Sequence, residues 1–523
     1  MRFLEDHRSM AEHSGKTIVY QVNTWVWLDT LSRKLGKSIT LENIPDAALD
    51  ELARPGVDYI WFMGVWQRSP YGQQTALKYK HEYRSVLPDL TDDDVIGSAY
   101  AVYDYQVDAR IGGRAGLAKA RQQLAKRGLK LMLDFVPNHV AADHAWTKDR
   151  PELLITGSAD DIVRRPTDFF HVRTARGDRI IAHGKDPHFA GWIDTAQVNA
   201  FSPELRRAHT EILLDIATQC DGVRCDMAML MFNSIFSNTW RGYVGLPPVV
   251  DYWREIIPHI KAKHPTFIFT AEVYWNLEYE ILQQGFDFAY DKLFYDRVVS
   301  GDVNLLRAHL LASIEYQRKL MRFIENHDEP RAYATLGHQR SFPAATLICT
   351  LPGAALIHDG QLIGRTKKLP VQIKRQPDEP EHKDLEAYYL KLLAETKDPI
   401  YRYGNFYLFH VQSSGGGDTT HHNLLAYGWH EPGKDYRLIV VNLTPHRSFG
   451  RINLGVWSWL TDHHWRLYDV TDGAEYKRHG GELTRDGLFI DLEPYESHVF
   501  RFVEAGLTHT ALLRRAVPEG DLR

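Results

Sequence analysis

Cysteine is scarce in this sequence, and its scarcity excludes several kinds of structure. The three cysteines, Cys220, Cys225 and Cys349, match no zinc-binding spacing, and an odd count does not suggest a disulfide framework. No apolar run approaches the roughly 18 residues that a membrane-spanning helix needs. Residues 1–16 are charged throughout and lack the apolar core of a signal peptide. We therefore expect a cytoplasmic protein that does not enter a membrane.

An excess of positive charge is missing as well. The 523 residues include 62 Lys or Arg and 67 Asp or Glu, which gives a net charge of -5 and a pI near 6.6. Because there is no basic cluster either, a nucleic-acid partner is not expected. No G-x-G-x-x-G loop follows the first predicted strand, which argues against a dinucleotide-binding fold.

Aromatic residues, in contrast, are plentiful. They make up 12% of the chain, with 13 Trp and 26 Tyr, which is more than a core requires. Surplus aromatic faces are suited to stacking on sugar rings or nucleobases. The other fractions, 44% hydrophobic and 25% charged, are typical of a soluble globular protein with a large core.

Predicted strands and helices alternate along the first two thirds of the chain. The pattern predicts eight strands, at residues 16–23, 57–66, 129–136, 221–226, 266–273, 285–290, 320–328 and 354–358. Helices are predicted between them, at residues 45–54, 115–127, 202–219, 247–263, 303–314 and 344–351. Eight strand–helix units predict an α/β fold, a (β/α)₈ TIM barrel. A doubly wound open sheet is the competing arrangement.

Changes in the sequence pattern also predict the domain boundaries of the chain. Residues 14–140 and 196–398 form the predicted barrel, and residues 141–195, which lose periodicity after the third strand, form an inserted subdomain. Short alternating runs from 399 to 503 predict a C-terminal antiparallel β domain. A lead-in at 1–13 and a tail at 504–523 complete the prediction.

Ionisable residues stand at the ends of four predicted strands. Arg224 and Asp226 are two apart, so on a strand both side chains share a face, and the cation favours the ionised carboxylate. The other three strand ends carry Asp134 with His139, Glu272, and His327 with Asp328. In a TIM barrel the carboxyl ends of the strands meet at one mouth. Carboxylates gathered there suit glycoside hydrolysis, in which one attacks and another protonates the leaving oxygen; a divalent-metal cluster is the alternative.

Four motifs that contain these residues resemble, in the same order, the four sequence regions of the α-amylase superfamily of glycoside hydrolases. They are DFVPNH (134–139), GVRCD (222–226), FTAEV (269–273) and ENHD (325–328). The resemblance covers the predicted barrel, and the C-terminal β domain fits the same architecture. It implies a retaining enzyme.

The resemblance also implies roles for individual residues. Asp226 matches the nucleophile, Glu272 the general acid/base and Asp328 the carboxylate that stabilises the transition state. Four further residues match substrate-binding positions: Arg224 beside the nucleophile, His139 and His327 around the reacting sugar, and Tyr100 as the aromatic platform beneath it.

Some positions depart from the family pattern. Met229 and Leu230 stand where the endo-acting amylases carry a Lys-His pair whose His supports a structural calcium ion. We therefore expect no metal and no cofactor, although Asn138 is retained. Ala101 follows Tyr100 where α-glucosidase-like members carry Asp, so exo and endo action both stay open.

The leading hypothesis is a retaining glycosidase of the α-amylase or α-glucosidase type, acting on α-linked oligosaccharides or polysaccharides through a covalent glycosyl-enzyme intermediate. A transglycosylase or isomerase of the glucanotransferase or trehalose-synthase type is the alternative, because only the acceptor differs. A catalytically silent carbohydrate-binding protein is the third hypothesis. Silent relatives are expected to have lost a carboxylate, and Asp226, Glu272 and Asp328 are all present. The sequence fixes neither linkage nor oligomeric state.

Overall fold

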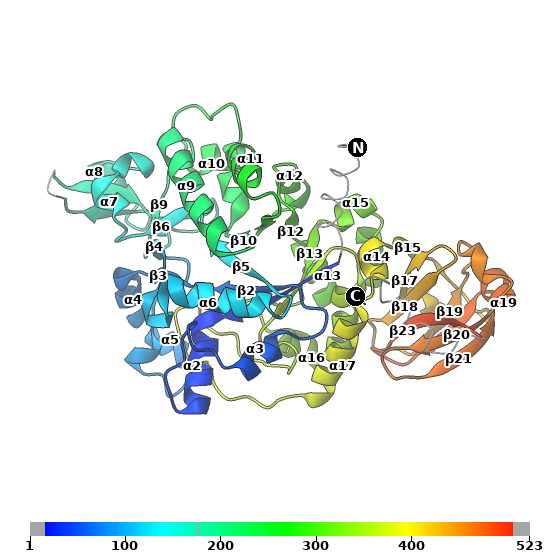
Figure 1. The fold of residues 1–523 in the computed structure, drawn as a ribbon. Helices are drawn as coiled ribbons and strands as arrows, with labels where there is room; N and C mark the ends of the chain where they lie inside the picture. Colours follow the sequence, from blue (N-terminus) through cyan, green and yellow to red (C-terminus); the bar gives the residue numbers. More distant parts are fainter. Residues whose placement is uncertain (1–15, 175–176, 506–523) are drawn as a thin grey trace, which may run out of the picture. The chain divides into compact units, whose positions relative to one another are not determined.

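The computed structural model of the protein describes residues 16–174 and 177–505 (Figure 1). The predicted lead-in at 1–13, and the predicted tail from residue 506 onward, lie outside the described residues. The chain divides into two compact units. Of the described residues, 16–174, 177–293, 319–334 and 353–381 belong to unit 1, and 294–318, 335–352 and 382–505 belong to unit 2. The division falls within helices α13 (Lys292–Ser300) and α16 (Ala332–Thr350).

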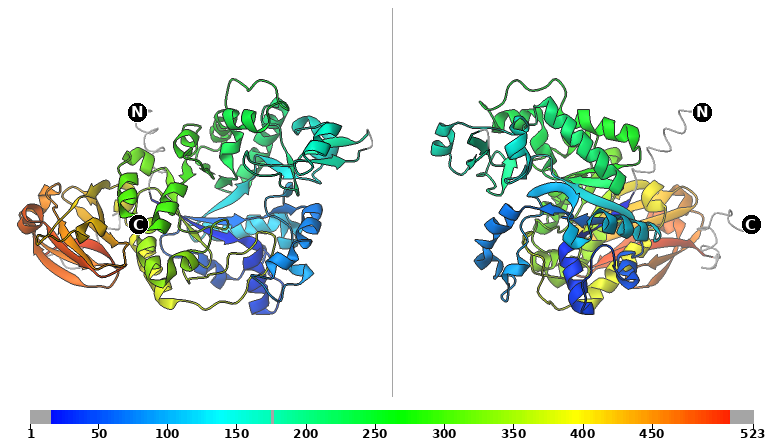
Figure 2. Two further views of the ribbon diagram at one scale, coloured as in Figure 1. Left: turned by 180° about the vertical axis from the view of Figure 1, so that it is seen from behind. Right: turned by 60° about the vertical axis from the view of Figure 1, so that its left-hand side comes forward.

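Unit 1 contains a closed barrel of eight parallel strands (Figures 1 and 2). Around the barrel they run in the order β1 (Thr17–Asn23), β14 (Ala354–His358), β13 (Leu320–Arg322), β12 (Phe288–Tyr290), β11 (Ile268–Ala271), β10 (Gly222–Cys225), β5 (Lys130–Phe135) and β2 (Tyr59–Met63). The predicted (β/α)₈ barrel is thus confirmed, and the open sheet is excluded because the last strand in this order, β2, pairs with the first, β1, and closes the ring.

Each predicted barrel strand exists, but several are shorter than predicted. The strand predicted at 320–328 ends at Arg322, and residues 323–328 form an irregular segment at the barrel mouth. The segment begins with the apolar residues Phe323 and Ile324, so its sequence resembles the continuation of a strand, although its backbone does not pair with a neighbouring strand. Several strands are buried along their whole length, as parallel barrel strands with helices outside require.

Helices follow the strands of unit 1. They include α2 (Thr24–Leu35), α3 (Asp46–Leu52), α4 (Pro70–Leu77), α6 (Gly113–Ala125), α9 (Pro203–Gln219), α10 (Asn233–Thr239), α11 (Tyr252–Lys263) and α12 (Glu278–Leu282). Helix α9 begins as its sequence predicts, because Ser202 caps it by accepting a hydrogen bond from the Leu205 N–H, with Pro203 as its first residue. Helix α2 was not predicted. Gly36, which ends it in a left-handed conformation, is a typical sequence signal for the end of a helix.

The segment between β5 and α9 forms an inserted subdomain after the third barrel strand (Figure 1). It contains two antiparallel pairs, β6 (His139–Ala141) with β9 (Thr195–Gln197) and β7 (Phe169–Val172) with β8 (Arg179–Ala182). Short helices α7 (Trp146–Asp149) and α8 (Ala159–Arg164) complete it. A further antiparallel pair, β3 (Trp66–Arg68) with β4 (Val102–Val107), follows β2 in the chain.

Unit 2 contains helices and the C-terminal antiparallel β domain. Its helices include α14 (Val303–His309), α15 (Ile314–Gln317), α17 (Lys383–Glu395), α18 (Ile400–Tyr403) and α19 (Gly480–Arg485). One sheet has the order β15 (Asn405–Phe409), β17 (Leu424–Glu431), β18 (Asp435–Asn442), β23 (Ser497–Glu504), β20 (His464–Asp469) and β21 (Glu475–His479). The second has the order β16 (Val411–Gln412), β19 (Ser448–Ile452) and β22 (Leu488–Leu492). Side chains from both sheets, including Leu438, Ile452 and Ile490, form one buried core.

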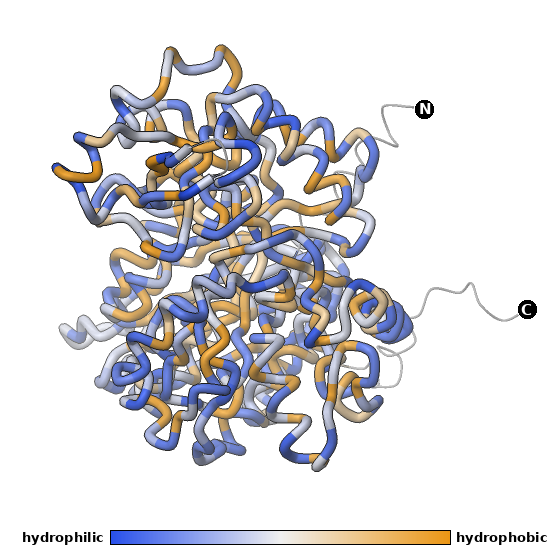
Figure 3. The backbone as a smooth tube through the Cα atoms, turned by 90° about the vertical axis from the view of Figure 1, so that its left-hand side faces the viewer, coloured by the Kyte–Doolittle hydropathy of each residue, from blue (hydrophilic) through white to orange (hydrophobic). Residues whose placement is uncertain are grey.

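Hydrophobic stretches along the backbone are short and interrupted by hydrophilic residues (Figure 3). Within the two described ranges, no helix combines the length and the apolar character needed to cross a membrane.

The register of neighbouring strands fixes which side chains share a level inside the barrel. Arg224 of β10 lies opposite Asp134 of β5 on one side and Thr270 of β11 on the other. Gly222 makes this close approach of β10 to β11 feasible, since a Cβ atom there would lie 2.4 Å from Ile268 Cγ1 and 2.9 Å from the Ile268 carbonyl oxygen.

Gly222→Ala is therefore expected to destabilise the barrel. The methyl group would have to displace a neighbouring strand, at a cost of roughly 1–3 kcal/mol for overpacking a core. Thermal denaturation should show a melting temperature several degrees lower. Gly245→Ala is the matched control, because a Cβ at Gly245 has nothing within 4 Å. Equal melting temperatures for the two variants would contradict this reading of β10.

Candidate active site

The guanidinium of Arg224 is the centre of the group of residues at the barrel mouth. Its Nη1 lies 2.7 Å from Asp226 Oδ1 and 3.9 Å from Asp134 Oδ1. Its Nη2 lies 2.8 Å from Glu272 Oε2 and 3.7 Å from Asp328 Oδ2. The structure thus brings the three predicted catalytic carboxylates and Arg224 together. Asp134, named only as a strand end in the sequence, joins them.

Aromatic rings enclose the same guanidinium. The Arg224 Cζ atom lies 5.1 Å from the ring centroid of Tyr100, 5.4 Å from that of Trp61 and 5.9 Å from that of Tyr290. The Arg224 side chain is only 1% exposed. A cation in this setting is stabilised by the faces of the rings as well as by the carboxylates.

Burial and charge affect the carboxylates differently. Burial raises the pKa of Glu272 to about 7; Arg224 opposes this, and the charges of Asp226 and Asp328 reinforce it. Burial also raises the pKa of Asp226, against the effect of Arg224. The pKa of Asp328 is lowered, because His327, Arg224 and Lys368 together outweigh its burial. The sequence argument for Asp226 considered Arg224 and left out burial, which acts in the opposite direction.

Three groups hold the carboxylate of Glu272. Its Oε2 accepts a hydrogen bond from the Met227 N–H at 2.6 Å, in addition to the contact with Arg224. Its Oε1 accepts a hydrogen bond from the Tyr274 hydroxyl at 2.8 Å. Met227 adopts a left-handed conformation (φ 41°), which is uncommon for a residue with a side chain. Strain of this kind is typical of functional sites.

Tyr274 was missed in the sequence, although the signal was present. It stands two residues after Glu272, the same spacing that pairs Arg224 with Asp226.

His327 connects Asp328, Tyr100 and the first barrel strand. Its Nε2 lies 2.9 Å from Asp328 Oδ2 and 2.6 Å from the Tyr100 hydroxyl, and its ring stacks on Tyr100 with centroids 5.3 Å apart. The Gln21 amide nitrogen lies 2.7 Å from His327 Nδ1. This contact joins His327 to strand β1. Gln21 was also missed, since it lies in a strand whose sequence carries no motif.

His139 belongs to the site through Tyr100. It begins β6, is buried, and its ring centroid lies 5.1 Å from that of Trp192 in the inserted subdomain. Burial lowers the pKa of His139 to about 4, although a hydrogen bond with the Tyr100 backbone opposes the shift. The ring is therefore neutral at pH 7.

The residues around Asn138 do not form an oxygen cage for calcium. The Asn138 side-chain oxygen accepts a hydrogen bond from Gln197 Nε2 at 3.0 Å, and the Asn138 amide nitrogen lies 3.3 Å from Gln197 Oε1. Asp168, in the same subdomain, is paired with Lys185 at 2.9 Å. Leu230 is buried and offers no side-chain ligand. Calcium prefers six to eight oxygen ligands, which this arrangement does not supply.

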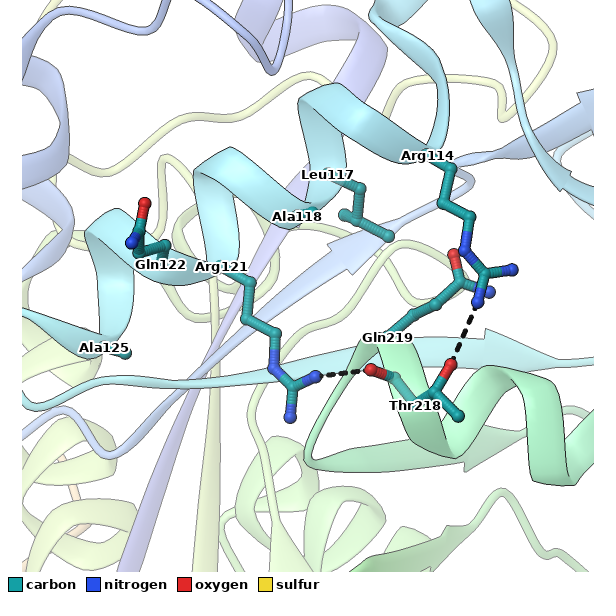
Figure 4. Close-up of a pocket in the computed structure, with 8 residues that line it drawn as sticks. All are labelled: Arg114, Leu117, Ala118, Arg121, Gln122, Ala125, Thr218 and Gln219. Atoms are coloured by element: carbon teal, nitrogen blue, oxygen red, sulfur yellow. Dashed lines mark hydrogen bonds between the residues drawn. The ribbon is translucent and has the colours of Figure 1, made fainter.

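A separate hollow of about 320 Å³ lies between α6 and α9 (Figure 4). Arg114 and Arg121 reach into it, but Arg114 is paired with Asp215 and Arg121 with Asp221. None of the residues grouped around Arg224 lines it, so it is not part of the candidate active site.

A closed (β/α)₈ barrel with carboxylates grouped at the carboxyl ends of its strands defines a class of barrel enzymes whose chemistry is done at that mouth. The family model for the alpha amylase catalytic domain matches residues 47–403, more than half of the chain. The chain therefore belongs to the α-amylase family.

Individual relatives are distant. Alpha-amylase 3 of Dictyoglomus thermophilum is 22% identical over 299 residues, which cover 53% of this chain and 56% of that protein. Alpha-amylase MalA of Haloarcula japonica is 25% identical over 331 residues, covering 61% and 40%. The chain thus spans about half the length of these relatives. A noncanonic maltogenic alpha-amylase, AmyB from Thermotoga neapolitana, shares the fold, with a TM-score of 0.64 and 18% identity over 93% of this chain and 98% of that one.

Calcium is expected to leave this protein unchanged. After removal of divalent ions with a chelator, adding millimolar Ca²⁺ should alter neither the melting temperature nor the activity, because the amide of Asn138 is paired with Gln197 and position 230 carries no ligand. Calorimetry and an activity assay check this. A rise of many degrees on adding Ca²⁺ would show that the Asn138 region binds calcium after rearrangement.

Proposed function

We propose that this protein is a retaining glycoside hydrolase that acts on α-linked glucosides through a covalent glycosyl-enzyme intermediate. One observation carries the proposal: a single buried guanidinium gathers three carboxylates, of which Glu272 and Asp226 have a raised pKa and Asp328 has a lowered pKa. A nucleophile and an acid need such unequal environments. Membership of the α-amylase family supports the same reaction class.

Asp226 is the proposed nucleophile. Arg224 holds its Oδ1 at 2.7 Å, which orients the carboxylate and opposes the effect of burial on its ionisation. The carboxylate attacks the anomeric carbon, the bond to the leaving oxygen breaks, and the sugar is joined to Asp226 as an ester.

Glu272 is the proposed acid and base. With a pKa of about 7 it carries a proton on a large fraction of molecules at neutral pH. Its Oε2 already accepts from the Met227 N–H and faces Arg224, so the acidic proton resides on Oε1, beside the Tyr274 hydroxyl. Oε1 gives that proton to the leaving oxygen and later takes one from the water that cleaves the ester.

Asp328, His327, His139 and Tyr100 are proposed to hold the reacting sugar. Asp328 keeps its negative charge because His327, Arg224 and Lys368 lower its pKa, and that charge stabilises the oxocarbenium-like transition state. Tyr100 offers an aromatic ring for the apolar face of the sugar, which fits an uncharged oligosaccharide. The neutral His139 can donate and accept hydrogen bonds with hydroxyl groups.

The stereochemistry of the product tests this proposal. Proton NMR during hydrolysis of an α-linked substrate should show the α-anomer first, because two inversions at one carbon restore its configuration. Asp226→Ala and Glu272→Gln should each lower kcat by roughly 10³-fold or more while the barrel stays folded. An initial β-anomer would rule out the covalent role of Asp226. Products in which a sugar replaces water as acceptor would make the enzyme a transglycosylase.

The alkaline limb of the pH–activity profile should report the titration of Glu272, so kcat/KM should fall as the pH rises through about 7. The Tyr274 hydroxyl donates to the charged form of Glu272 and so favours it. In Tyr274→Phe the limb should therefore move upward by about one pH unit, the scale of one hydrogen bond to a charged group. Tyr403→Phe, at an exposed position of unit 2, is the control. If the alkaline limb of Tyr274→Phe coincides with that of the wild type, Tyr274 does not affect the pKa of the titrating group.

A further inference from the structure

Two histidines and an aspartate converge in unit 2. One ligand atom from each of His338, His382 and Asp384 lies within 4.8 Å of the other two, and His338 Nε2 lies 3.0 Å from Asp384 Oδ2. Among the described residues, no other group of at least three His, Cys, Asp or Glu side chains converges in this way. None of the three has a role in the proposed glycosidase reaction.

An interruption in helix α16 and the start of helix α17 place these three residues. Gly337 interrupts α16 with φ 72° and ψ 179°, so His338 begins a second helical segment. His382 precedes α17, and Asp384 lies in the first turn of that helix, where a carboxylate is favoured. The starts of two helical segments, 44 positions apart in the chain, thus present their polar side chains to one another.

Packing restricts the orientation of His338. Its ring packs edge-on against Phe342, with centroids 5.1 Å apart, and Phe342 packs edge-on against Tyr388 at 5.0 Å. The Tyr388 hydroxyl is hydrogen-bonded to Thr346 Oγ1 at 2.6 Å. A ligand side chain supported in this way loses less conformational freedom when it binds an ion.

We propose that His338, His382 and Asp384 form a binding site for a divalent transition-metal ion of the zinc class. Two imidazole nitrogens and one carboxylate oxygen are ligands that Zn²⁺ accepts at about 2.0–2.2 Å, and ligand atoms around a tetrahedral ion are then about 3.3 Å apart. The His338–Asp384 distance of 3.0 Å already suits this geometry. A change in the side-chain rotamer of the half-buried His382 brings in the third ligand.

Solvent completes the coordination. The side chains of His338 and Asp384 are 44% and 58% exposed, so water reaches the fourth position. Calcium and magnesium are disfavoured, because they require oxygen ligands in larger number or in an octahedral array. The partial positive charge of the nearby helix start weakens binding, which places the site among accessible, exchangeable metal sites rather than permanent ones.

Binding would connect the interruption in α16 to the start of α17. An ion that binds the folded protein and not the unfolded chain stabilises the fold by RT ln(1 + [ion]/Kd), so the melting temperature rises with the free concentration of the ion. The site therefore links the stability of unit 2 to the supply of zinc, without a part in the chemistry at Arg224.

The experiment uses the full-length protein, stripped of metal by chelation and dialysis. Isothermal titration with ZnCl₂ should show about one site per chain, and Co²⁺ should give the intense visible absorption of a four-coordinate ion. Saturating Zn²⁺ should raise the melting temperature by several degrees. In His338→Gln and His382→Gln, affinity for Zn²⁺ should fall at least about tenfold and the shift in melting temperature should disappear.

His464→Gln is the matched control. His464 and His479 also form a surface histidine pair, with ring centroids 4.7 Å apart, but in the part of the chain that the structure describes no third ligand converges with them. This variant should bind Zn²⁺ as the wild type does. The melting temperature of each metal-free variant is first compared with that of the metal-free wild type, to check that the variant is folded. If a histidine variant is poorly folded, Asp384→Asn replaces it in the titration.

Two results would overturn the proposal. In the first, the wild type shows no Zn²⁺ binding, which would make His338 and Asp384 a simple ion pair. In the second, the His338, His382 and Asp384 variants retain wild-type affinity, which would place the zinc on other histidines. Both results are independent of glycosidase activity, so neither affects the function proposed for the barrel.

Discussion

A buried guanidinium surrounded by an excess of carboxylates is the constraint on which the site depends. Arg224 lies within 3.9 Å of oxygen atoms from four acidic side chains, and its own side chain is almost wholly buried. Arg224 alone cannot balance the charges of Asp134, Asp226 and Glu272, which are buried, whereas Asp328 is partly exposed and has Lys368 as a further cationic neighbour. The arrangement therefore favours the protonated form of some of these carboxyl groups, and the pKa values of Glu272, Asp226 and Asp134 are accordingly raised.

The barrel supplies this constraint through its register. Asp134 and Arg224 are Cα partners on adjacent strands, and Glu272 directly follows β11, the other neighbour of β10. The Glu272 N–H is bonded to the Cys225 carbonyl, and the Asp226 N–H to the Phe135 carbonyl, so backbone hydrogen bonds of the sheet fix the starting point of each side chain. Because backbone pairing sets these positions, the side chains need little further ordering when a substrate binds.

The sequence predicted the parts of this arrangement that depend on periodicity and on short motifs. The eight barrel strands and the ionisable residues at four of the strand ends were predicted in this way, since strand ends converge in a closed parallel barrel whatever the connecting loops do. The rings of Trp61 and Tyr290 beside Arg224 were missed. Gln21 and Tyr274 were not, because a single polar side chain in or after an apolar strand has no recognisable pattern. The direction of the pKa shift of Asp226 was also out of reach, since it depends on burial within the folded barrel. The boundary at Arg322 could not be found because residues 323–327 are as buried as a strand without pairing as one.

The partners of the two carboxylates decide which one can exchange protons. Asp226 Oδ1 faces a guanidinium, which only donates hydrogen bonds, so a proton on that oxygen would meet a donor. Glu272 Oε1 faces a phenol hydroxyl, which donates when the carboxylate is charged and accepts when it is protonated. A general acid that must lose and regain a proton in each cycle needs the second kind of partner. This difference in hydrogen-bond partners supports the roles proposed for Glu272 as the acid and for Asp226 as the nucleophile, and it does so independently of the order of the motifs in the chain.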